Sequence, residues 1–232
     1  MMLEALCAEV LEANLELVRR GLVLYTFGNA SGIARDEGLV VIKPSGVAYE
    51  ALKPADLVVV SLDGKIVEGK LRPSSDLPTH LMLYRSFPSI GGVAHTHSRA
   101  ATAWAQARRE IPCFGTTHAD YCRGPVPVTK PLSPAEIRSD YEANTGRAIV
   151  RRFRGLDPLH FPGVLVGGHG PFCWAATPAE AAHNAVIVEE IAAMALQTLA
   201  ANPKARPIPH VLRDKHFLRK HGSTRYYGQD KP

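Results

Sequence analysis

The chain has 232 residues, of which 46% are hydrophobic, and this length can bury the core of one large domain that spans residues 1–232. The formal charge of +5 comes from dispersed basic residues and only 7% of the residues are aromatic, so the composition disfavours nucleic acid as a partner and suits a small anionic substrate. The four cysteines form no C-x-x-C pair, and we find neither a signal-peptide pattern nor an apolar run of membrane-spanning length, so we expect a soluble, cytoplasmic protein.

The first predicted element is an amphipathic helix over residues 3–18, where apolar residues recur at helical spacing. Gly21 follows two arginines and is expected to end this helix. The pattern then changes to short β-rich runs broken by Gly, Asp and Pro, which predicts strands. These runs are residues 39–42, 57–61 and 65–67, and Asp63-Gly64 predicts a tight hairpin turn between the last two.

Two later helices carry N-terminal capping signals. Ser133-Pro134-Ala135-Glu136 and Thr177-Pro178-Ala179-Glu180 each place a capping hydroxyl, a first-turn proline and a glutamate in capping-box order. The second helix should run from Pro178 to about Ala201. Two apolar runs, residues 90–94 and 163–168, read as buried strands. A sheet sandwiched by helices accounts for these elements, so we expect a single-domain α/β fold with α/β/α layers and a central, mostly antiparallel sheet.

The triplet His95-Thr96-His97 follows the first of these apolar runs. Alternate side chains of an extended strand point to the same side, so the two imidazoles can face one cation. His169 follows the second run in a glycine-rich turn and offers a third imidazole. Neutral imidazole is a preferred zinc ligand, and a catalytic zinc needs few protein ligands. Histidines also serve as hydrogen-bonded core residues, and this alternative stays open.

Three small-residue loops offer groups that bind anions. They are Gly28-Asn29-Ala30-Ser31-Gly32, Lys43-Pro44-Ser45-Gly46 and Pro73-Ser74-Ser75-Asp76. Glycine lets backbone amides approach an anion, serine and asparagine add donors and Lys43 adds a charge, so the loops together can hold a phosphate. None matches a nucleotide-binding motif, and each alone can also be an ordinary turn. Asp76 likewise has an alternative role at the N-terminus of a helix.

In this order, the motifs resemble the class II aldolase/epimerase family, whose fold is also that of the adducin head. The resemblance extends over nearly the whole chain, because further segments match as well. The matching segments are residues 28–29, 43–46, 73–76, 95–99, 115–121, 169–172, 183–185, 214–222 and 226–229. Several separate motifs in one order are far more specific than any one of them.

The resemblance implies one zinc ion per subunit, or manganese or cobalt in its place, held by Asp76, His95, His97 and His169. Substrate and phosphate contacts are implied for Gly28, Asn29, Lys43, Ser45, Gly46, Ser74 and Ser75. Asp120 and Tyr227 match residues with acid/base roles, and Thr116, Glu142 and His216 match positions beside a subunit interface. The resemblance also implies a homotetramer in which Tyr227 comes from a neighbouring subunit.

Within the family, the chain is most similar to enzymes that invert C4 of a phosphorylated pentulose. The implied reaction interconverts L-ribulose 5-phosphate and D-xylulose 5-phosphate by retro-aldol cleavage and re-addition. The alternative is an L-fuculose-phosphate-type aldolase, whose relatives usually carry Glu where this chain has Asp76. A zinc hydrolase is disfavoured because Arg99 and Ala100 replace the Asp and His of its H-x-H-x-D-H signature. The complete set of metal ligands disfavours a non-catalytic scaffold.

Overall fold

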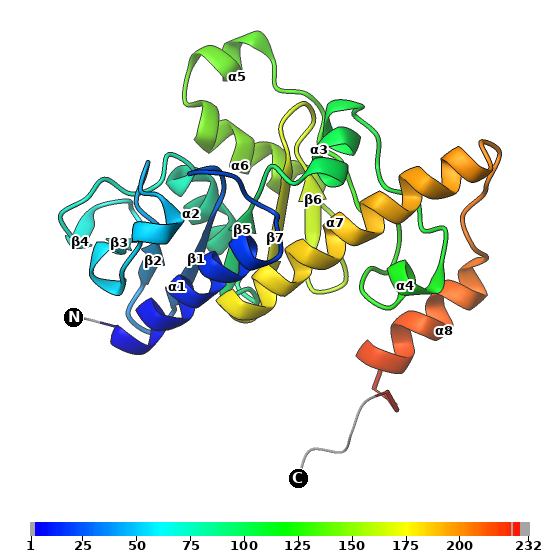
Figure 1. The fold of residues 1–232 in the computed structure, drawn as a ribbon, viewed down its shortest axis with the longest axis horizontal. Helices are drawn as coiled ribbons and strands as arrows, with labels where there is room; N and C mark the ends of the chain where they lie inside the picture. The colour runs from blue at the N-terminus through cyan, green and yellow to red at the C-terminus, as the bar shows by residue number, and fades with distance from the viewer. Residues whose placement is uncertain (1–2, 224, 228–232) are drawn as a thin grey trace.

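The computed structural model describes residues 3–223 and 225–227 (Figure 1), so Gly228 and Gln229 of the last matching segment lie outside the described residues. Within these residues a seven-stranded sheet has the order β4-β3-β2-β1-β5-β7-β6. Every neighbouring pair is antiparallel, which confirms the predicted sheet type. The strands are β1 (Asn29–Ala34), β2 (Leu39–Ile42), β3 (Val58–Ser61), β4 (Ile66–Glu68), β5 (Gly92–His95), β6 (Gly163–Leu165) and β7 (Pro171–Ala175).

Helices cover both faces of the sheet, and the predicted α/β/α layering is confirmed (Figure 1). α1 (Glu4–Arg19) and α7 (Pro178–Ala201) pack on one face, whereas α2 (Leu77–Ser86) and α6 (Tyr141–Arg152) pack on the other. The shorter helices are α3 (Arg99–Gln106), α4 (Thr116–Ala119), α5 (Pro134–Arg138) and α8 (His210–His221), with 3-10 turns η1 (Tyr49–Ala51) and η2 (Pro54–Asp56). α4 packs against α8.

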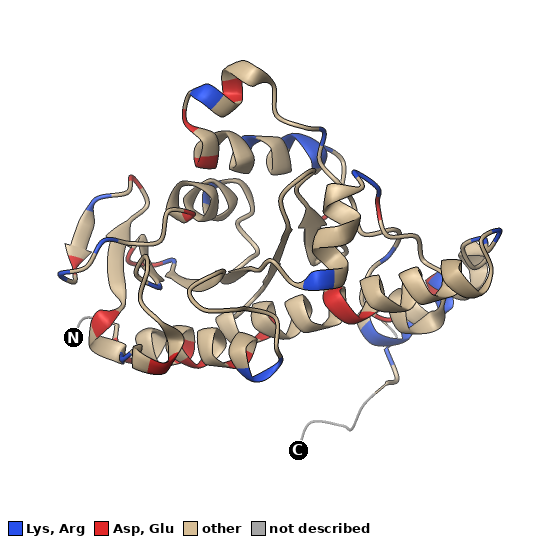
Figure 2. Cartoon of the chain, turned by 45° about the horizontal axis from the view of Figure 1, so that its top comes forward, with Lys and Arg blue, Asp and Glu red and all other residues tan. Residues whose placement is uncertain are grey.

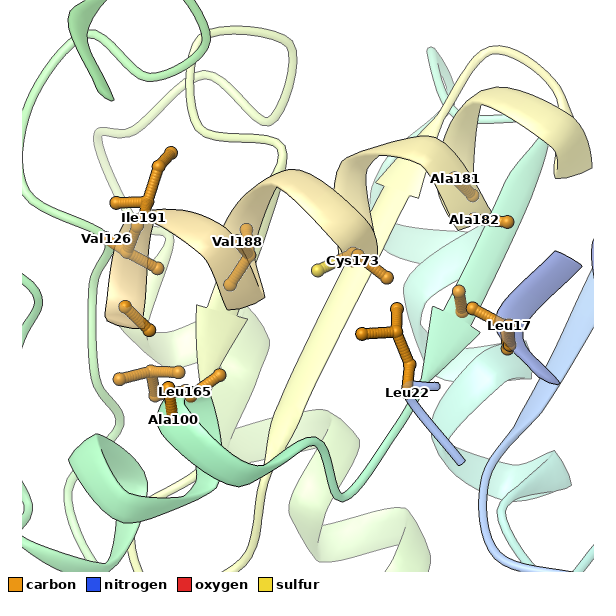
Figure 3. Packing of buried hydrophobic residues seen from close by; sticks show 14 of the residues in the cluster. Leu17, Leu22, Ala100, Val126, Leu165, Cys173, Ala181, Ala182, Val188 and Ile191 are labelled. Atoms are coloured by element: carbon orange, nitrogen blue, oxygen red, sulfur yellow. The ribbon is translucent and has the colours of Figure 1, made fainter. Parts of the chain in front are cut away.

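Side chains that alternate along the strands supply a hydrophobic core on each face of the sheet, as the two-residue period of a strand requires. On β5, Val93 packs with residues of α2 and α6, whereas its neighbour Ala94 packs with residues of α1 and α7. The second of these cores is rich in small residues: Ala181 and Ala182 of α7 lie over the sheet near Cys173 of β7 (Figure 3). Small side chains let α7 lie close to the strands.

The expectation of a loop at Gly28-Asn29-Ala30-Ser31-Gly32 is wrong for all but its first residue. Residues from Asn29 onward form β1, which pairs with both β2 and β5 in the middle of the sheet. The small residues serve packing: a Cβ atom on Gly32 would lie 2.7 Å from both Leu6 of α1 and Pro178 of α7. Composition alone cannot distinguish such a strand from a turn, because the helices that require small residues are distant in sequence.

The predicted helix ends and turns are confirmed. α1 is followed by Gly21 at φ +67°, whose N–H donates to Val18, and Leu22 donates to Leu17, with which it shares a core (Figure 3). The Ser133 hydroxyl accepts from the amide of Glu136, and the Glu136 carboxylate accepts from the amide of Ser133. Thr177 accepts from the amide of Glu180, and α7 ends at Ala201. Gly64 turns the hairpin between β3 and β4 at φ +87°.

The apolar runs at residues 90–94 and 163–168 form β5 and β6, but both strands are shorter than expected. β5 ends at His95, so His97 lies in the segment that leads to α3. β6 ends at Leu165, and His169 lies in the turn between β6 and β7, where the Val166 amide donates to Gly170. The histidines therefore stand at strand ends and in the following loops.

α7 is the only helix in the described part of the chain that is long and apolar enough to cross a membrane by length and composition. One of its faces is buried against α1 and the sheet, and carries Ala181, Ala182, Ala185, Val188, Ile191, Ala192 and Ala195. Glu189 and Glu190 interrupt the apolar sequence. α7 is a core helix of this fold.

The positive charge of the chain is spread over its surface. Figure 2 shows Lys and Arg interspersed with Asp and Glu on the helices and loops around the sheet. Many of these charges pair locally, as Arg20 does with Glu16 and Lys65 with Asp63. Exposed pairs of this kind contribute little to stability.

Glu189 of α7 caps the N-terminus of α3, the helix that follows His97. Its two carboxylate oxygens accept hydrogen bonds from the amides of Ala100 at 2.8 Å and Ala101 at 2.9 Å. The side chain of Ser98, at the N-cap position itself, makes no capping hydrogen bond. A carboxylate at a helix N-terminus also interacts favourably with the helix dipole. Glu189 thus fixes α3 to α7, and with it the segment that carries His97.

We expect Glu189→Ala to lower the free energy of unfolding by about 1–3 kcal/mol, because two amides lose a charged acceptor. Urea unfolding followed by circular dichroism measures this change. The matched control is Glu190→Ala, which removes an exposed carboxylate one residue away and should change the stability by no more than about 0.5 kcal/mol. Equal losses in the two variants would contradict the capping role.

Candidate metal centre and anion pocket

Three histidines from two segments of the chain meet at one edge of the sheet. The Nε2 atom of His97 lies 3.1 Å from Nε2 of both His95 and His169. One ring nitrogen from each histidine lies within 4.8 Å of the others. The predicted convergence of the three imidazoles is therefore present. The sheet order explains it, because β5 and β7 are neighbours and the end of β5 lies beside the turn that begins β7.

The surroundings of His95 leave its Nε2 lone pair available. Nδ1 of His95 lies 2.9 Å from the carbonyl oxygen of Pro171, so Nδ1 holds the proton and Nε2 can bind a cation. Burial, followed by the neighbouring imidazoles, lowers the pKa of His169 to about 4 and places the pKa of His97 below its ordinary value. Neutral imidazoles with facing lone pairs repel one another unless a cation lies between them. The donor set fits a divalent ion such as zinc.

Asp76 lines the same pocket, but its carboxylate lies outside the group of three histidines whose ligand atoms are within 4.8 Å of one another. It stands at the N-cap of α2, yet its carboxylate caps no amide there, so the capping alternative is wrong. Instead, Nδ2 of Asn29 donates to its Oδ2 at 2.7 Å. Burial opposes ionisation, but the nearby imidazoles of His95 and His80 and the hydrogen bond from Asn29 together hold the pKa of Asp76 below its ordinary value. An ionised carboxylate therefore stands beside the histidines.

A pocket of about 390 Å³ contains both the histidines and the anion-binding loops. Every residue to which the resemblance assigned substrate or phosphate contact in these loops lines it, and so does one residue assigned to the interface. These residues are Gly28, Asn29, Lys43, Ser45, Gly46, Ser74, Ser75 and Glu142. The residues predicted from the sequence thus share one cavity with the candidate metal centre.

Backbone hydrogen bonds join the Lys43 loop to the Ser74 loop. The amide of Ser45 donates to Arg72 at 2.9 Å, and the amide of Ser74 donates to Lys43 at 3.0 Å. Asn29 links these loops to the metal centre, because its Nδ2 donates to Ser74 Oγ as well as to Asp76. Its Oδ1 is buried and has no partner among the described residues, so it can accept a hydrogen bond from a ligand.

Sequence reasoning missed several residues of the pocket wall. Tyr141, the first residue of α6, places its hydroxyl 3.5 Å from Nδ1 of His169. Thr26 and Phe27 also line the pocket, and the Phe27 ring lies 6.2 Å from that of His97. No motif marks these positions. Only the packing of α6 and of the segment before β1 brings them to the site.

The residues assigned acid/base roles form a second group, around α4 and α8. Asp120 follows α4, and its Oδ1 accepts from Nδ1 of His216 at 3.0 Å and from Nε of Arg219 at 3.0 Å. A second nitrogen of Arg219 donates to Oδ2 at 2.6 Å. Burial opposes the charge of Asp120, but these hydrogen bonds outweigh it, and its pKa lies below its ordinary value. Asp120 is thus a carboxylate held by cations.

Tyr227 belongs to the same group. Its ring centroid lies 4.8 Å from the guanidinium of Arg219, which also binds Asp120. Thr116 begins α4, one turn before Asp120. None of Thr116, Asp120, His216 and Tyr227 lines the pocket that contains the histidines of the same chain. The structure therefore brings Asp120, His216 and Tyr227 together, but not at the metal centre of their own chain.

A buried hydrogen-bond chain fixes α2 to β1. Ser31 Oγ of β1 lies 2.7 Å from Nδ1 of His80 and 2.8 Å from the hydroxyl of Tyr84, both on α2. Burial lowers the pKa of His80 to about 3. Since His80 lies one turn after Asp76 and β1 begins with Asn29, the Ser31–His80 contact fixes the relative positions of two pocket residues, whereas Tyr84 holds the C-terminal part of α2, away from the pocket. His118 is a second buried imidazole, 2.8 Å from the carbonyl of Gly124, and burial lowers its pKa to about 4.

We expect the free energy of unfolding to fall as the pH decreases from about 6.5 towards 4. His80 and His118 stay neutral in the folded state down to pKa values of about 3 and about 4, whereas in the unfolded chain they take up protons near their ordinary value of 6.5. The unfolded chain therefore binds more protons in this window, at a cost of up to about 1.4 kcal/mol per pH unit and group. Urea unfolding at several pH values in this window measures the slope. A shallower slope is expected for His118→Gln, and a flat wild-type profile would contradict the argument.

Comparisons with known proteins agree with this geometry. The family described as "Class II Aldolase and Adducin N-terminal domain" matches residues 8–196. The chain is 54% identical over 227 residues to the L-ribulose-5-phosphate 4-epimerase UlaF of Salmonella paratyphi B, which covers 98% of this chain and 100% of that relative. The UlaF protein of Salmonella typhi is similar with the same identity and coverage.

Solved structures share the fold. An L-fuculose 1-phosphate aldolase has a TM-score of 0.76 at 25% identity, covering 91% of this chain and 95% of the other. The l-fuculose-1-phosphate aldolase of Thermus thermophilus has a TM-score of 0.67 at 25% identity, covering 86% and 97%. These neighbours agree with a class II aldolase-like α/β fold built on an antiparallel sheet.

Proposed function

The chain belongs to the class II aldolase and adducin N-terminal domain family, and on this basis we propose that it is an epimerase that interconverts L-ribulose 5-phosphate and D-xylulose 5-phosphate. The observation that carries the proposal is the shared pocket, because three converging histidines and the buried Lys43 line one cavity. A phosphorylated ketose has oxygens for a metal at one end and an anion at the other. The 54% identity to the UlaF enzymes supports this choice of substrate.

His95, His97 and His169 would hold the metal ion, with Asp76 as the fourth protein ligand. Zinc suits three imidazoles and a carboxylate, and manganese and cobalt accept the same donors. When bound, the ion supplies Lewis-acid stabilisation of the negative charge that develops on the ketose oxygens as the C3–C4 bond breaks. The hydrogen bond from Asn29 orients the Asp76 carboxylate for its role.

The anion-binding loops would retain the fragment that carries the phosphate. Lys43 supplies positive charge, Ser45, Ser74 and Ser75 supply hydroxyl groups, and Gly28 and Gly46 allow the backbone to approach the phosphate closely. Inversion at C4 requires that the aldehyde rotate and react on its other face before it leaves. A firm hold on the distant phosphate permits this rotation and prevents escape.

Asp120 and Tyr227 would exchange the proton of the C4 hydroxyl, one on each face of the aldehyde. Both lie outside the pocket of their own chain, so in this mechanism a neighbouring subunit of a homotetramer supplies them. Thr116 lies one helical turn before Asp120, His216 hydrogen-bonds to Asp120, and Glu142 lines the pocket and would face the neighbouring subunit. Two acid/base groups on opposite faces suit an epimerisation.

We also infer a cytoplasmic enzyme formed by a single domain over residues 1–232. Cys113, Cys122 and Cys173 are buried thiols, as expected in a reducing compartment. The sheet is continuous from β4 to β6 and its two helical layers each pack over several strands, which supports one domain.

The second candidate is an aldolase that releases the two fragments, because solved neighbours at 25% identity are L-fuculose 1-phosphate aldolases. Incubation with L-ribulose 5-phosphate, followed by NMR of the products, separates the two activities. We expect D-xylulose 5-phosphate without free aldehyde, and we expect a chelator to abolish turnover until zinc is restored. Accumulation of glycolaldehyde phosphate would favour the aldolase, and turnover that is insensitive to chelator would contradict the metal-dependent mechanism.

We expect Asp120→Asn to lower kcat about 100- to 10,000-fold, because the amide cannot accept the substrate proton. Metal content measured by plasma mass spectrometry should stay equal to that of the wild type, since Asp120 does not line the pocket that contains the histidines. The matched control is Asp36→Asn in the exposed turn between β1 and β2, which should retain full activity. Loss of metal from the Asp120 variant would contradict the assignment.

A further inference from the structure

Lys43 is an ammonium group buried without a counter-charge. The residue is 1% exposed, and no carboxylate among the described residues forms an ion pair with it. Its Nζ donates to the carbonyl oxygens of Val47 at 2.7 Å and Pro44 at 3.3 Å. It also lies 4.7 Å from the centre of the Tyr49 ring, within cation–π range. The two carbonyl dipoles and the Tyr49 ring offset only part of the cost of burying the Lys43 ammonium, so an anion bound nearby would be stabilised by this charge.

Tyr49 touches two of the three anion-binding segments, at Gly28 and at Lys43. It is 2% exposed, and its ring faces the Lys43 ammonium. On the other side, its hydroxyl donates to the carbonyl oxygen of Gly28 at 2.9 Å and to that of Phe27 at 3.1 Å. A hydroxyl has one proton, so the two carbonyls share it. Among the described residues, no other side chain combines a hydrogen bond or cation–π contact to the Lys43 ammonium with a hydrogen bond to the Gly28 carbonyl.

The Phe27-Gly28 segment depends on this contact for its orientation. Gly28 has a φ of +74°, and a Cβ atom there would lie 2.7 Å from the carbonyl oxygen of His95. The C=O and N–H of a trans peptide point in opposite directions. By holding the Phe27 and Gly28 carbonyls, the Tyr49 hydroxyl fixes the direction of the Gly28 amide at the wall of the pocket.

We propose that Tyr49 is a positioning residue for the phosphate group of the substrate. Its ring places the Lys43 ammonium and its hydroxyl places the Gly28 peptide, so that both act on the same anion. Tyr49 does not line the pocket, and it acts through these two groups without touching the ligand. This inference rests on the proposed function, because it takes a phosphorylated ketose as the ligand.

Two substitutions separate the two contacts. Tyr49→Phe keeps the ring over Lys43 and removes the hydroxyl, and we expect it to raise KM for L-ribulose 5-phosphate about tenfold with kcat within about twofold. Tyr49→Leu removes both contacts, and we expect a further increase in KM of about fivefold. Inhibition by inorganic phosphate should weaken by the same factors. With unphosphorylated L-ribulose as the substrate, kcat/KM should stay within about twofold of the wild type.

The matched control is Tyr84→Phe, in which another buried tyrosine loses its hydroxyl, here from Ser31. Thermal unfolding should show that both Phe variants fold and lose similar stability. The Tyr84 variant should leave the ratio of kcat/KM values for phosphorylated and unphosphorylated substrate unchanged. If Tyr49→Phe lowers kcat/KM equally for both substrates, or leaves inhibition by phosphate unchanged, Tyr49 has a structural role only and the proposal fails.

Failure of the proposed function gives a different result, namely a wild-type protein that converts neither substrate. Calorimetric titration with inorganic phosphate then tests Tyr49 alone. Weaker binding to Tyr49→Phe than to the wild type and Tyr84→Phe supports the positioning role. Equal binding to all three proteins, or no binding to the wild type, overturns it.

Discussion

The approach of three imidazole nitrogens is the constraint on which the rest of the structure depends. His97 lies 3.1 Å from both His95 and His169 between Nε2 atoms, a separation close to that of nitrogen ligands around one tetrahedral cation. The fold places the rings there because β5 and β7 are adjacent and antiparallel. The carbonyl of Pro171 then keeps the proton of His95 on Nδ1, and Glu189 caps the helix that follows His97. The β5–β7 pairing, the turn before β7 and the Glu189 cap of α3 thus all position the three histidines.

The pocket has two chemically different ends, and Asn29 connects them. At one end are the histidines and Asp76, and at the other is the buried charge of Lys43. The side-chain amide of Asn29 donates both to Asp76 and to Ser74 of the anion-binding loops. A ligand that satisfies both ends has oxygen donors for a metal and a separate anionic group. A phosphorylated ketose meets this requirement, whereas a neutral sugar would leave Lys43 without a counter-charge.

The sequence could predict the elements whose signals are local. The Thr177 cap and the apolar stretch behind it predicted α7 to its last residue, and Asp63-Gly64 predicted its hairpin. β1 was missed because its small residues are required by the close packing of α1 and α7 against Gly32. These helices are distant in sequence, so no local pattern indicates the contact. Tyr141 was missed for the same reason. The pocket residues were predicted only through the order of motifs in a family, since each loop alone was compatible with an ordinary turn.

Anomalous X-ray diffraction across the zinc absorption edge, from crystals grown with a zinc salt, tests the central claim most directly. We expect one anomalous peak per chain, bounded by the Nε2 atoms of His95, His97 and His169 and within coordination distance of the Asp76 carboxylate. An anomalous map without a peak between these imidazoles, or with zinc bound elsewhere while the three rings hydrogen-bond to protein or water, would contradict it.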